Sequence, residues 1–233
     1  MILPNMTPQE MMKELHKDDD ALRSVNMRFL TFGGIKHLRR QEAKFPAYIT
    51  KEQRTSRGNR YLCQFLFRKR GDIFTLNGLE TRLAIMETKD GLSGVSLVFS
   101  GKFNKEVVYV YRPHVYKRYK ERMGLDLEGI ELIRYFDKRN CDTIYNYDYI
   151  HKEGDEENDF MLTIRDGALF GTIQEVDGEY CYIIKTFIAN DTMQEGYKAQ
   201  FNNRYNEEVR NLEKEYGQYG DGCAYQFDYK YRK

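Results

Sequence analysis

The chain has no tryptophan and almost no net charge. Among its 233 residues, 37 Lys and Arg stand against 36 Asp and Glu, which leaves a formal net charge of +1. A protein that attracts nucleic acid or an anionic membrane through its overall field needs a large positive surplus. The bulk charge excludes that class, so any such attraction must come from a local cluster of basic side chains.

Long apolar runs and disulfide patterns are missing as well. The sequence has no run of about 18 apolar residues and no basic-then-apolar leader, so it predicts no membrane span and no classical secretion signal. No two cysteines have the C-x-x-C spacing. We therefore expect buried thiols in a reducing compartment and a cytoplasmic protein. The cysteines are Cys63, Cys141, Cys181 and Cys223.

The motifs that hold metals and nucleotide phosphates are also absent. The sequence contains neither of the common phosphate-binding glycine loops and no H-E-x-x-H motif. The histidines at 16, 37, 114 and 151 are far apart, so we expect no metal site and no cofactor. Residues 155–159 are acidic, but they lack the central glycine of a calcium-binding loop and are more typical of a solvated loop.

What the sequence does contain begins with helix signals. Thr7, Pro8 and Glu10 form a capping pattern that predicts a short helix ending near Lys17. The acidic residues 18–20 are suited to cap a second helix, with apolar residues three and four apart. Residues 50–60 are polar and basic, which predicts a loop.

Strand signals dominate the middle of the chain. Runs rich in Val, Phe and Tyr and bounded by Gly, Asn or Asp predict strands at 61–67, 81–88, 94–103, 106–112, 160–164, 168–176 and 179–188. Asp166-Gly167 and Asp177-Gly178 predict tight turns. Tyr145, Tyr147 and Tyr149 alternate with polar residues, so three tyrosines would share a strand face, either to stack bases or sugars or to pack under a helix.

The order of elements favours an α+β fold, because helices and strands do not alternate regularly. We expect antiparallel sheet(s) with N-terminal helices, a central helix pair at 113–140 and a long C-terminal amphipathic helix at 192–216. That last helix could pack on its own sheet or form an oligomer with a second copy. The predicted domains are residues 1–105 and 106–233, or one continuous domain if 107–111 pairs on both sides.

A basic stripe is the one feature that suggests a site. His114, Arg118 and Arg122 are four residues apart and would align on one helix face. Between positions 105 and 122, six Lys or Arg stand against two Glu. His114 would lie at the helix N-terminus, where backbone amides favour an anion, and Arg112 and Lys117 would add binding contacts.

The stripe also has a purely structural interpretation. A basic helix face is commonly solvated or paired with acids, and the acidic loop at 153–159 is an available partner. His114 could simply cap the helix. The sequence leaves these interpretations open beside the functional one.

The stripe, a second helix and a β-meander that closes on a Lys-Thr-Phe strand resemble the barnase/EndoU/colicin/RelE-type ribonucleases and toxins over roughly residues 109–190. The resemblance implies metal-independent RNA cleavage, with His114 as general acid or base and Thr186 orienting the phosphate. It also implies that cations stabilise the pentavalent phosphate. Those cations would be Arg118, Arg122 and Lys185.

Two functional hypotheses follow. The first is a non-enzymatic binding or accessory protein, of the mobile-element or phage type, whose stripe holds RNA, another phosphate-bearing ligand or an acidic protein surface. The alternative is the endoribonuclease. On a regular strand Lys185 and Thr186 point to opposite faces, so the alternative requires a bulge or a strand end there.

Overall fold

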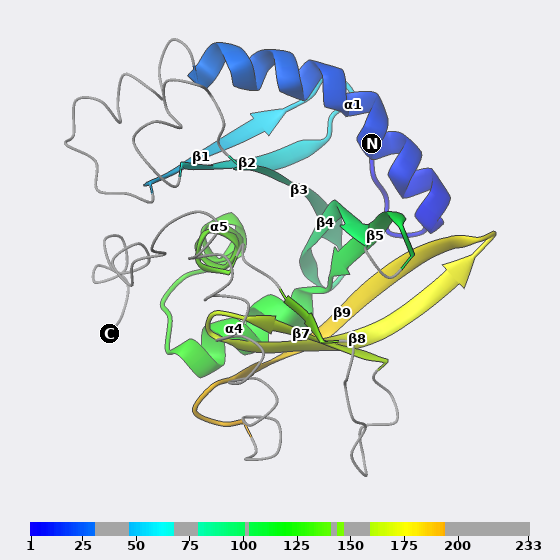
Figure 1. Ribbon diagram of the computed structural model, residues 1–233. Coiled ribbons are helices and arrows are strands. Elements are labelled where there is room, and N and C mark those ends of the chain that lie inside the picture. The colour runs from blue at the N-terminus through cyan, green and yellow to red at the C-terminus, as the bar shows by residue number, and fades with distance from the viewer. Residues whose placement is uncertain (31–46, 68–78, 101–102, 141–143, 147–158, 194–233) are drawn as a thin grey trace.

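The computed structural model describes residues 1–30, 47–67, 79–100, 103–140, 144–146 and 159–193 (Figure 1). These residues form three helices and a mostly antiparallel nine-stranded sheet, so the predicted α+β class is confirmed. The helices are α1 (Pro8–Phe29), α4 (Pro113–Met123) and α5 (Gly129–Arg139). The strands are β1 (Ala47–Arg54), β2 (Arg60–Phe67), β3 (Leu79–Thr88), β4 (Gly91–Ser100), β5 (Lys105–Tyr111), β6 (Ile144–Asn146), β7 (Phe160–Ile164), β8 (Gly167–Val176) and β9 (Glu179–Ala189).

Two antiparallel meanders join edge to edge. The strand order is β1-β2-β3-β4-β5-β9-β8-β7-β6, and every neighbouring pair is antiparallel except β5 and β9. In that parallel pair Val108 lies opposite Cys181 and Tyr111 opposite Ile184. Strand β5 therefore pairs on both sides, and the sheet continues across the suggested boundary at residue 105.

The sheet curves around the central helix pair. Figure 1 shows α4 and α5 on its concave, inner side and α1 across its convex, outer side. Successive side chains of β5 point to opposite faces of the sheet. Val107 and Tyr109 pack with α4 and α5, whereas Val108 and Val110 pack with α1. Because both faces are covered, β2 is buried along almost its whole length, as a continuous hydrophobic run predicts.

The prediction that a short first helix ends near Lys17 and a second helix follows is wrong. Helix α1 is continuous over 22 residues, and it begins with the predicted capping box of Thr7 and Glu10. The carboxylates expected to cap a second helix have other partners. Asp18 is buried against the β1–β2 turn, and Asp19 accepts a 2.8 Å hydrogen bond from Arg82. An acid that finds a tertiary donor no longer competes for the helix backbone.

The predicted loop at 50–60 is also wrong in its first half. Residues 47–54 form β1, an edge strand paired in register with β2, and a turn follows at 55–59. Edge strands carry polar and charged side chains, so β1 lacks the apolar alternation that marks an interior strand. The tight turn at Asp177 and Gly178 is confirmed, because both residues have positive φ angles, 52° and 77°.

Asp137 of α5 provides a test of how this fold responds to pH. Its Oδ2 atom is buried and has no hydrogen-bond partner among the described residues, and burial raises the pKa of the carboxyl to about 7. The folded state therefore holds a proton that the unfolded state has already released. Stability should fall as pH rises from about 4, the ordinary pKa of Asp, to about 7.

We expect the melting temperature of the wild type to fall by several degrees over that interval relative to Asp137→Asn, which cannot ionise. Thermal denaturation in a pH series measures the difference. Parallel curves for the two proteins would contradict the prediction. Glu14 has the opposite effect at lower pH. Hydrogen bonds from Arg57 and Lys17 lower its pKa to about 2, so the stability of the fold should rise as pH rises from about 2 to the ordinary pKa of Glu.

Candidate functional site: the basic face of helix α4

Helix α4 starts directly at the end of β5. Arg112 caps it in an extended conformation, and its N–H donates to the carbonyl of Ile184 on β9 at 3.1 Å. Pro113 occupies the first turn, where no backbone donor is needed, and Gly124 ends the helix with a positive φ of 60°. These residues define where α4 begins and ends, and the hydrogen bond from Arg112 attaches its first turn to β9.

The helix has an apolar face and a basic face. Val115, Tyr116 and Tyr119 are buried against the sheet and α5. His114, Lys117, Arg118 and the capping Arg112 are exposed. We call these four residues the α4 basic face. Part of the predicted stripe therefore faces solvent, which is the position that a binding surface requires.

His114 and Arg118 contact each other. Arg118 Nε donates to His114 Nε2 at 3.2 Å, and its Nη1 lies 3.4 Å from the carboxylate of Glu121. The side chains of Arg118 and Glu121 are 45% and 46% exposed, so solvent screens their ion pair and it contributes little free energy. Arg118 can leave this pair for a stronger acceptor at small cost.

Arg122, the third member of the predicted stripe, is engaged elsewhere. It is half-buried, and its Nη1 donates to the backbone carbonyl of Phe187 on β9. Burial, with the nearby charge of Arg118, lowers its pKa. Arg122 therefore ties the last turn of α4 to the sheet and is not part of the α4 basic face.

Strand β9 contains a bulge of the kind that the ribonuclease interpretation requires. Thr186 lies opposite Phe170 and Ile184 lies opposite Gly171, so half-buried Lys185 is the extra residue in the register. Gly171 makes the close approach possible, because a Cβ there would stand 2.0 Å from the carbonyl oxygen of Ile183.

The bulge does not bring Thr186 to the stripe. The ring of Phe187 packs on Tyr119 of α4 with centroids 5.0 Å apart, so Phe187 points to the inner face. Its neighbour Thr186 must then point to the outer face. The structure joins His114 and Arg118, ties Arg122 to the β9 backbone, and leaves Thr186 on the other side of the sheet from all three.

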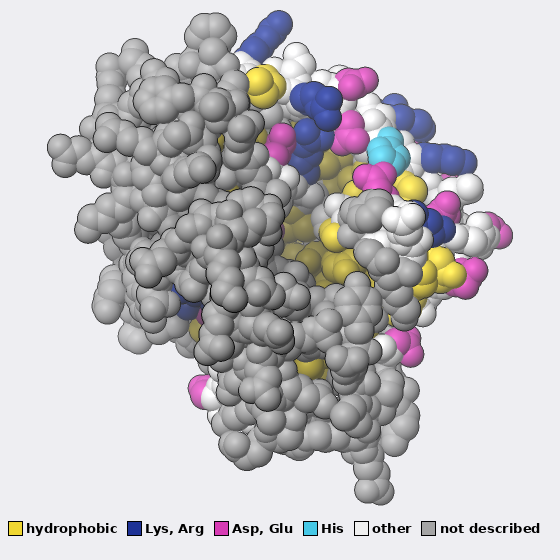
Figure 2. Space-filling view, in the orientation of Figure 1, with side chains coloured by type: hydrophobic (Ala, Val, Ile, Leu, Met, Phe, Trp, Pro, Cys, Tyr) yellow, Lys and Arg dark blue, Asp and Glu magenta, His cyan; other side chains and the backbone are white. Residues whose placement is uncertain are grey.

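In the described part of the chain, two cations of the α4 basic face make no ion pair, although the charge of Arg112 acts on the buried thiol of Cys181. No hydrogen bond or ion pair there involves the side chain of Arg112 or Lys117, whereas Lys120 reaches Glu128 at 2.5 Å. Figure 2 shows a contrasting surface: on the side where α1 lies, Lys and Arg mix with Asp and Glu. The α4 basic face thus differs from that surface by its surplus of unpaired positive charge.

A buried polar network that the sequence did not predict lies beneath α4. Asp166, at the β7–β8 turn, accepts hydrogen bonds from Tyr119 at 2.5 Å, from Arg139 at 2.6 and 2.8 Å, and from Asn140 at 3.3 Å. Burial, with the charge of Asp166, raises the pKa of Tyr119. Asp166-Gly167 predicts only a turn, and nothing in the spacing points to these partners. Since its acceptor atoms are satisfied, we assign the network a structural role.

Other predicted features can be placed only in part. Cys63 and Cys181 are buried free thiols, and burial raises the pKa of Cys181 to about 12. Within the described ranges no group of three or more His, Cys, Asp or Glu could hold a metal, and no helix is long and apolar enough to cross a bilayer. Several predictions lie outside those ranges. They are Cys141, Cys223, Tyr147, Tyr149, the acidic loop at 153–158 and most of the helix at 192–216.

Comparison with known proteins adds no relative. The chain matches no protein-family model, and no curated protein or solved structure is significantly similar to it. The geometry of the α4 basic face is therefore the observation that bears most directly on function.

Proposed function

We propose that the protein binds RNA, or a similar phosphate-bearing ligand, through the α4 basic face and does not cleave it. The observation that carries the proposal is the exposure of Arg112, His114, Lys117 and Arg118 with a single weakly held acid, Glu121, among them. Side chains one helical turn apart are about 5–6 Å from each other. Two of them can therefore contact one phosphate, or neighbouring phosphates of a flexible strand.

The residue types support a phosphate ligand. Arginine offers a planar fork of donors that matches two phosphate oxygens, and lysine adds a mobile point charge. Such contacts carry no sequence information and dominate non-specific binding to nucleic acid. The proposal therefore concerns affinity for the backbone of RNA and not for a particular sequence.

Reversing the charge of Lys117 and Arg118 tests the proposal. We expect the variant Lys117→Glu/Arg118→Glu to bind a radiolabelled oligouridylate at least about tenfold more weakly than the wild type in filter binding. The slope of log affinity against log salt should fall by about 0.7 for each phosphate that the variant fails to neutralise. Both residues are exposed, so folding should be unaffected, which circular dichroism would check.

The matched control carries the same change in net charge on another helix. Lys13 and Arg23 are exposed on α1 and have no partner among the described residues. The variant Lys13→Glu/Arg23→Glu should bind RNA nearly as well as the wild type. Equal losses of affinity in the two variants would mean that net charge alone attracts RNA and would sink the assignment to α4.

The ribonuclease alternative makes a separate prediction. The arrangement speaks against catalysis, because the Nε2 lone pair of His114 is occupied by Arg118 and Thr186 faces the other side of the sheet. We expect the wild type to leave several RNAs intact in the presence of EDTA. Cleavage that disappears in His114→Ala would overturn the non-enzymatic assignment and favour the alternative.

A further inference from the structure

The hydrogen bond between Arg118 and His114 fixes where the imidazole proton is. A guanidinium has only donors and keeps its charge at every physiological pH. Because Arg118 Nε donates at 3.2 Å, His114 Nε2 must accept with a free lone pair. The ring is then neutral and carries its one proton on Nδ1. The contact is therefore one that a neutral imidazole can make and an imidazolium cannot.

Adding a proton to His114 would remove that hydrogen bond. An imidazolium has an N–H on both nitrogens and no acceptor, so Arg118 would lose its partner. Two positive charges would stand one helical turn apart and repel each other. An anion between them would accept hydrogen bonds from both and relieve the repulsion. Protonation and anion binding would therefore favour each other.

We infer that the α4 basic face is a proton-coupled anion site, in which acid releases Arg118 from His114 and the two cations together hold one phosphate group. The inference rests on the proposed function and adds its regulation. At neutral pH the face presents mainly Arg112, Lys117 and a partly engaged Arg118. In acid it gains the charge of His114 and the full donor set of Arg118.

Among the described residues, the other charged groups around the pair do not cancel this effect. Glu121 is the only acid bonded to Arg118 among the described residues, and it is itself well exposed. Beyond β9, Asp191 acts electrostatically on Arg122, one helical turn after Arg118. The β3–β4 turn, which touches Pro113 through Gly91, brings one charge of each sign. Those two charges are Lys89 and Asp90.

Binding of a radiolabelled oligouridylate over a pH series tests the coupling, since uracil does not titrate in this interval. For the wild type at constant ionic strength we expect affinity to rise about tenfold from about pH 8 to about pH 5, the interval in which imidazoles change charge. The salt dependence should steepen by about 0.7 for each additional phosphate that is neutralised. In His114→Gln, whose amide can accept from Arg118 but cannot titrate, the affinity should no longer change with pH.

The matched control is another exposed histidine. His16 on α1 lies 3.2 Å from Asp19 and 3.1 Å from Glu106, away from α4 in the sequence. His16→Gln should keep the pH dependence of the wild type. If His114→Gln keeps it too, or if the wild type binds equally at every pH, the coupling is refuted while RNA binding stands. If the wild type binds at no pH, the proposed function itself has failed.

Nuclear magnetic resonance gives a readout that does not depend on binding. Long-range nitrogen–proton correlation spectra distinguish the two neutral tautomers of histidine. At about pH 8, above the range in which imidazoles ordinarily titrate, His114 should carry its proton on Nδ1, as the hydrogen bond from Arg118 requires. A proton on Nε2 would remove the geometric basis of the inference. Addition of inorganic phosphate should shift the His114 resonances and leave those of His16 unchanged.

Discussion

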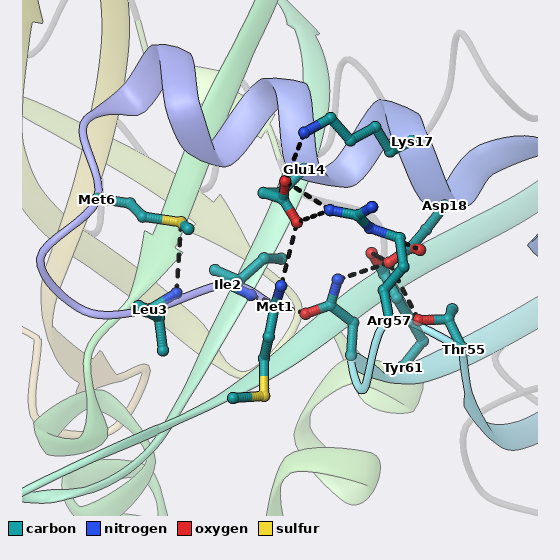
Figure 3. A network of polar contacts seen from close by, with 11 residues as sticks. Met1, Ile2, Leu3, Met6, Glu14, Lys17, Asp18, Thr55, Arg57 and Tyr61 are labelled. Carbon is teal, nitrogen blue, oxygen red and sulfur yellow. Dashed lines mark hydrogen bonds and ion pairs between the residues drawn. The ribbon is translucent and has the colours of Figure 1, made fainter.

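Asp18→Ala is expected to lower the free energy of unfolding by about 2–4 kcal/mol, because the substitution leaves buried donors without an acceptor. Asp18 is 1% exposed. It accepts hydrogen bonds from Tyr61 at 2.9 Å, from Asn59 at 2.6 Å and from Thr55 at 3.3 Å. Figure 3 shows how the side chains of the β1–β2 region converge on this carboxylate of α1. The contact therefore fastens α1 to the outer face of the sheet.

Urea denaturation measures this effect, and two variants calibrate it. Asp20→Ala changes an exposed acid of the same helix and should shift the free energy by no more than about 0.5 kcal/mol. Asp18→Asn keeps the shape of the side chain but replaces one acceptor oxygen by a donor, so it should fall between the two. An Asp18→Ala protein as stable as Asp20→Ala would mean that the network contributes no net stability.

Figure 3 also shows a second carboxylate of α1, that of Glu14, which Arg57 and Lys17 contact. Glu14 accepts from the N-terminal amine at 3.1 Å, from Lys17 at 2.7 Å and, through both of its oxygens, from Arg57 at 2.5 and 2.7 Å. This second carboxylate is closer to solvent than Asp18, and its partners are more exposed than Tyr61 and Asn59. Its removal should therefore cost less stability than the removal of Asp18.

Asp166→Ala is expected to cost about 3–5 kcal/mol, because removal of one partner leaves a buried charge uncompensated. The side chains of Arg139 and Asp166 are only 11% and 4% exposed, and they are 2.6 Å apart. Tyr119 and Asn140 would lose an acceptor at the same time. This carboxylate joins α4, α5 and the β7–β8 turn, so its removal should loosen the whole inner layer.

Urea denaturation and hydrogen exchange test the second expectation together. The amides of α5 should lose protection in Asp166→Ala, whereas Asp191→Ala, at an exposed acid after β9, should leave protection and stability nearly unchanged. A double-mutant cycle with Arg139→Ala isolates the ion pair, since the two decreases in stability should be far from additive. Additive decreases would mean that the two residues act independently.

Local signals predicted those elements whose cause lies within a few residues. The capping box at Thr7 and Glu10, the positive-φ turn at Asp177 and Gly178, and the Pro113 start of α4 all appear as the sequence indicates. Where the cause lies far away in the chain, the expectation was wrong. Asp18 does not break α1, because its acceptor atoms are used by a turn some forty residues later, and β1 forms because β2 provides the partner.

The candidate site, too, was predicted only in part from the sequence. Sequence alone determined that His114 and Arg118 share a helix face and that this face carries surplus positive charge, since helical spacing and residue type decide both. Only the tertiary structure decided that Arg122 donates to the carbonyl of Phe187 and that Thr186 faces the outer side of the sheet. Those outcomes depend on strand register and on a bulge at Lys185, and register is set by partners far away in the chain.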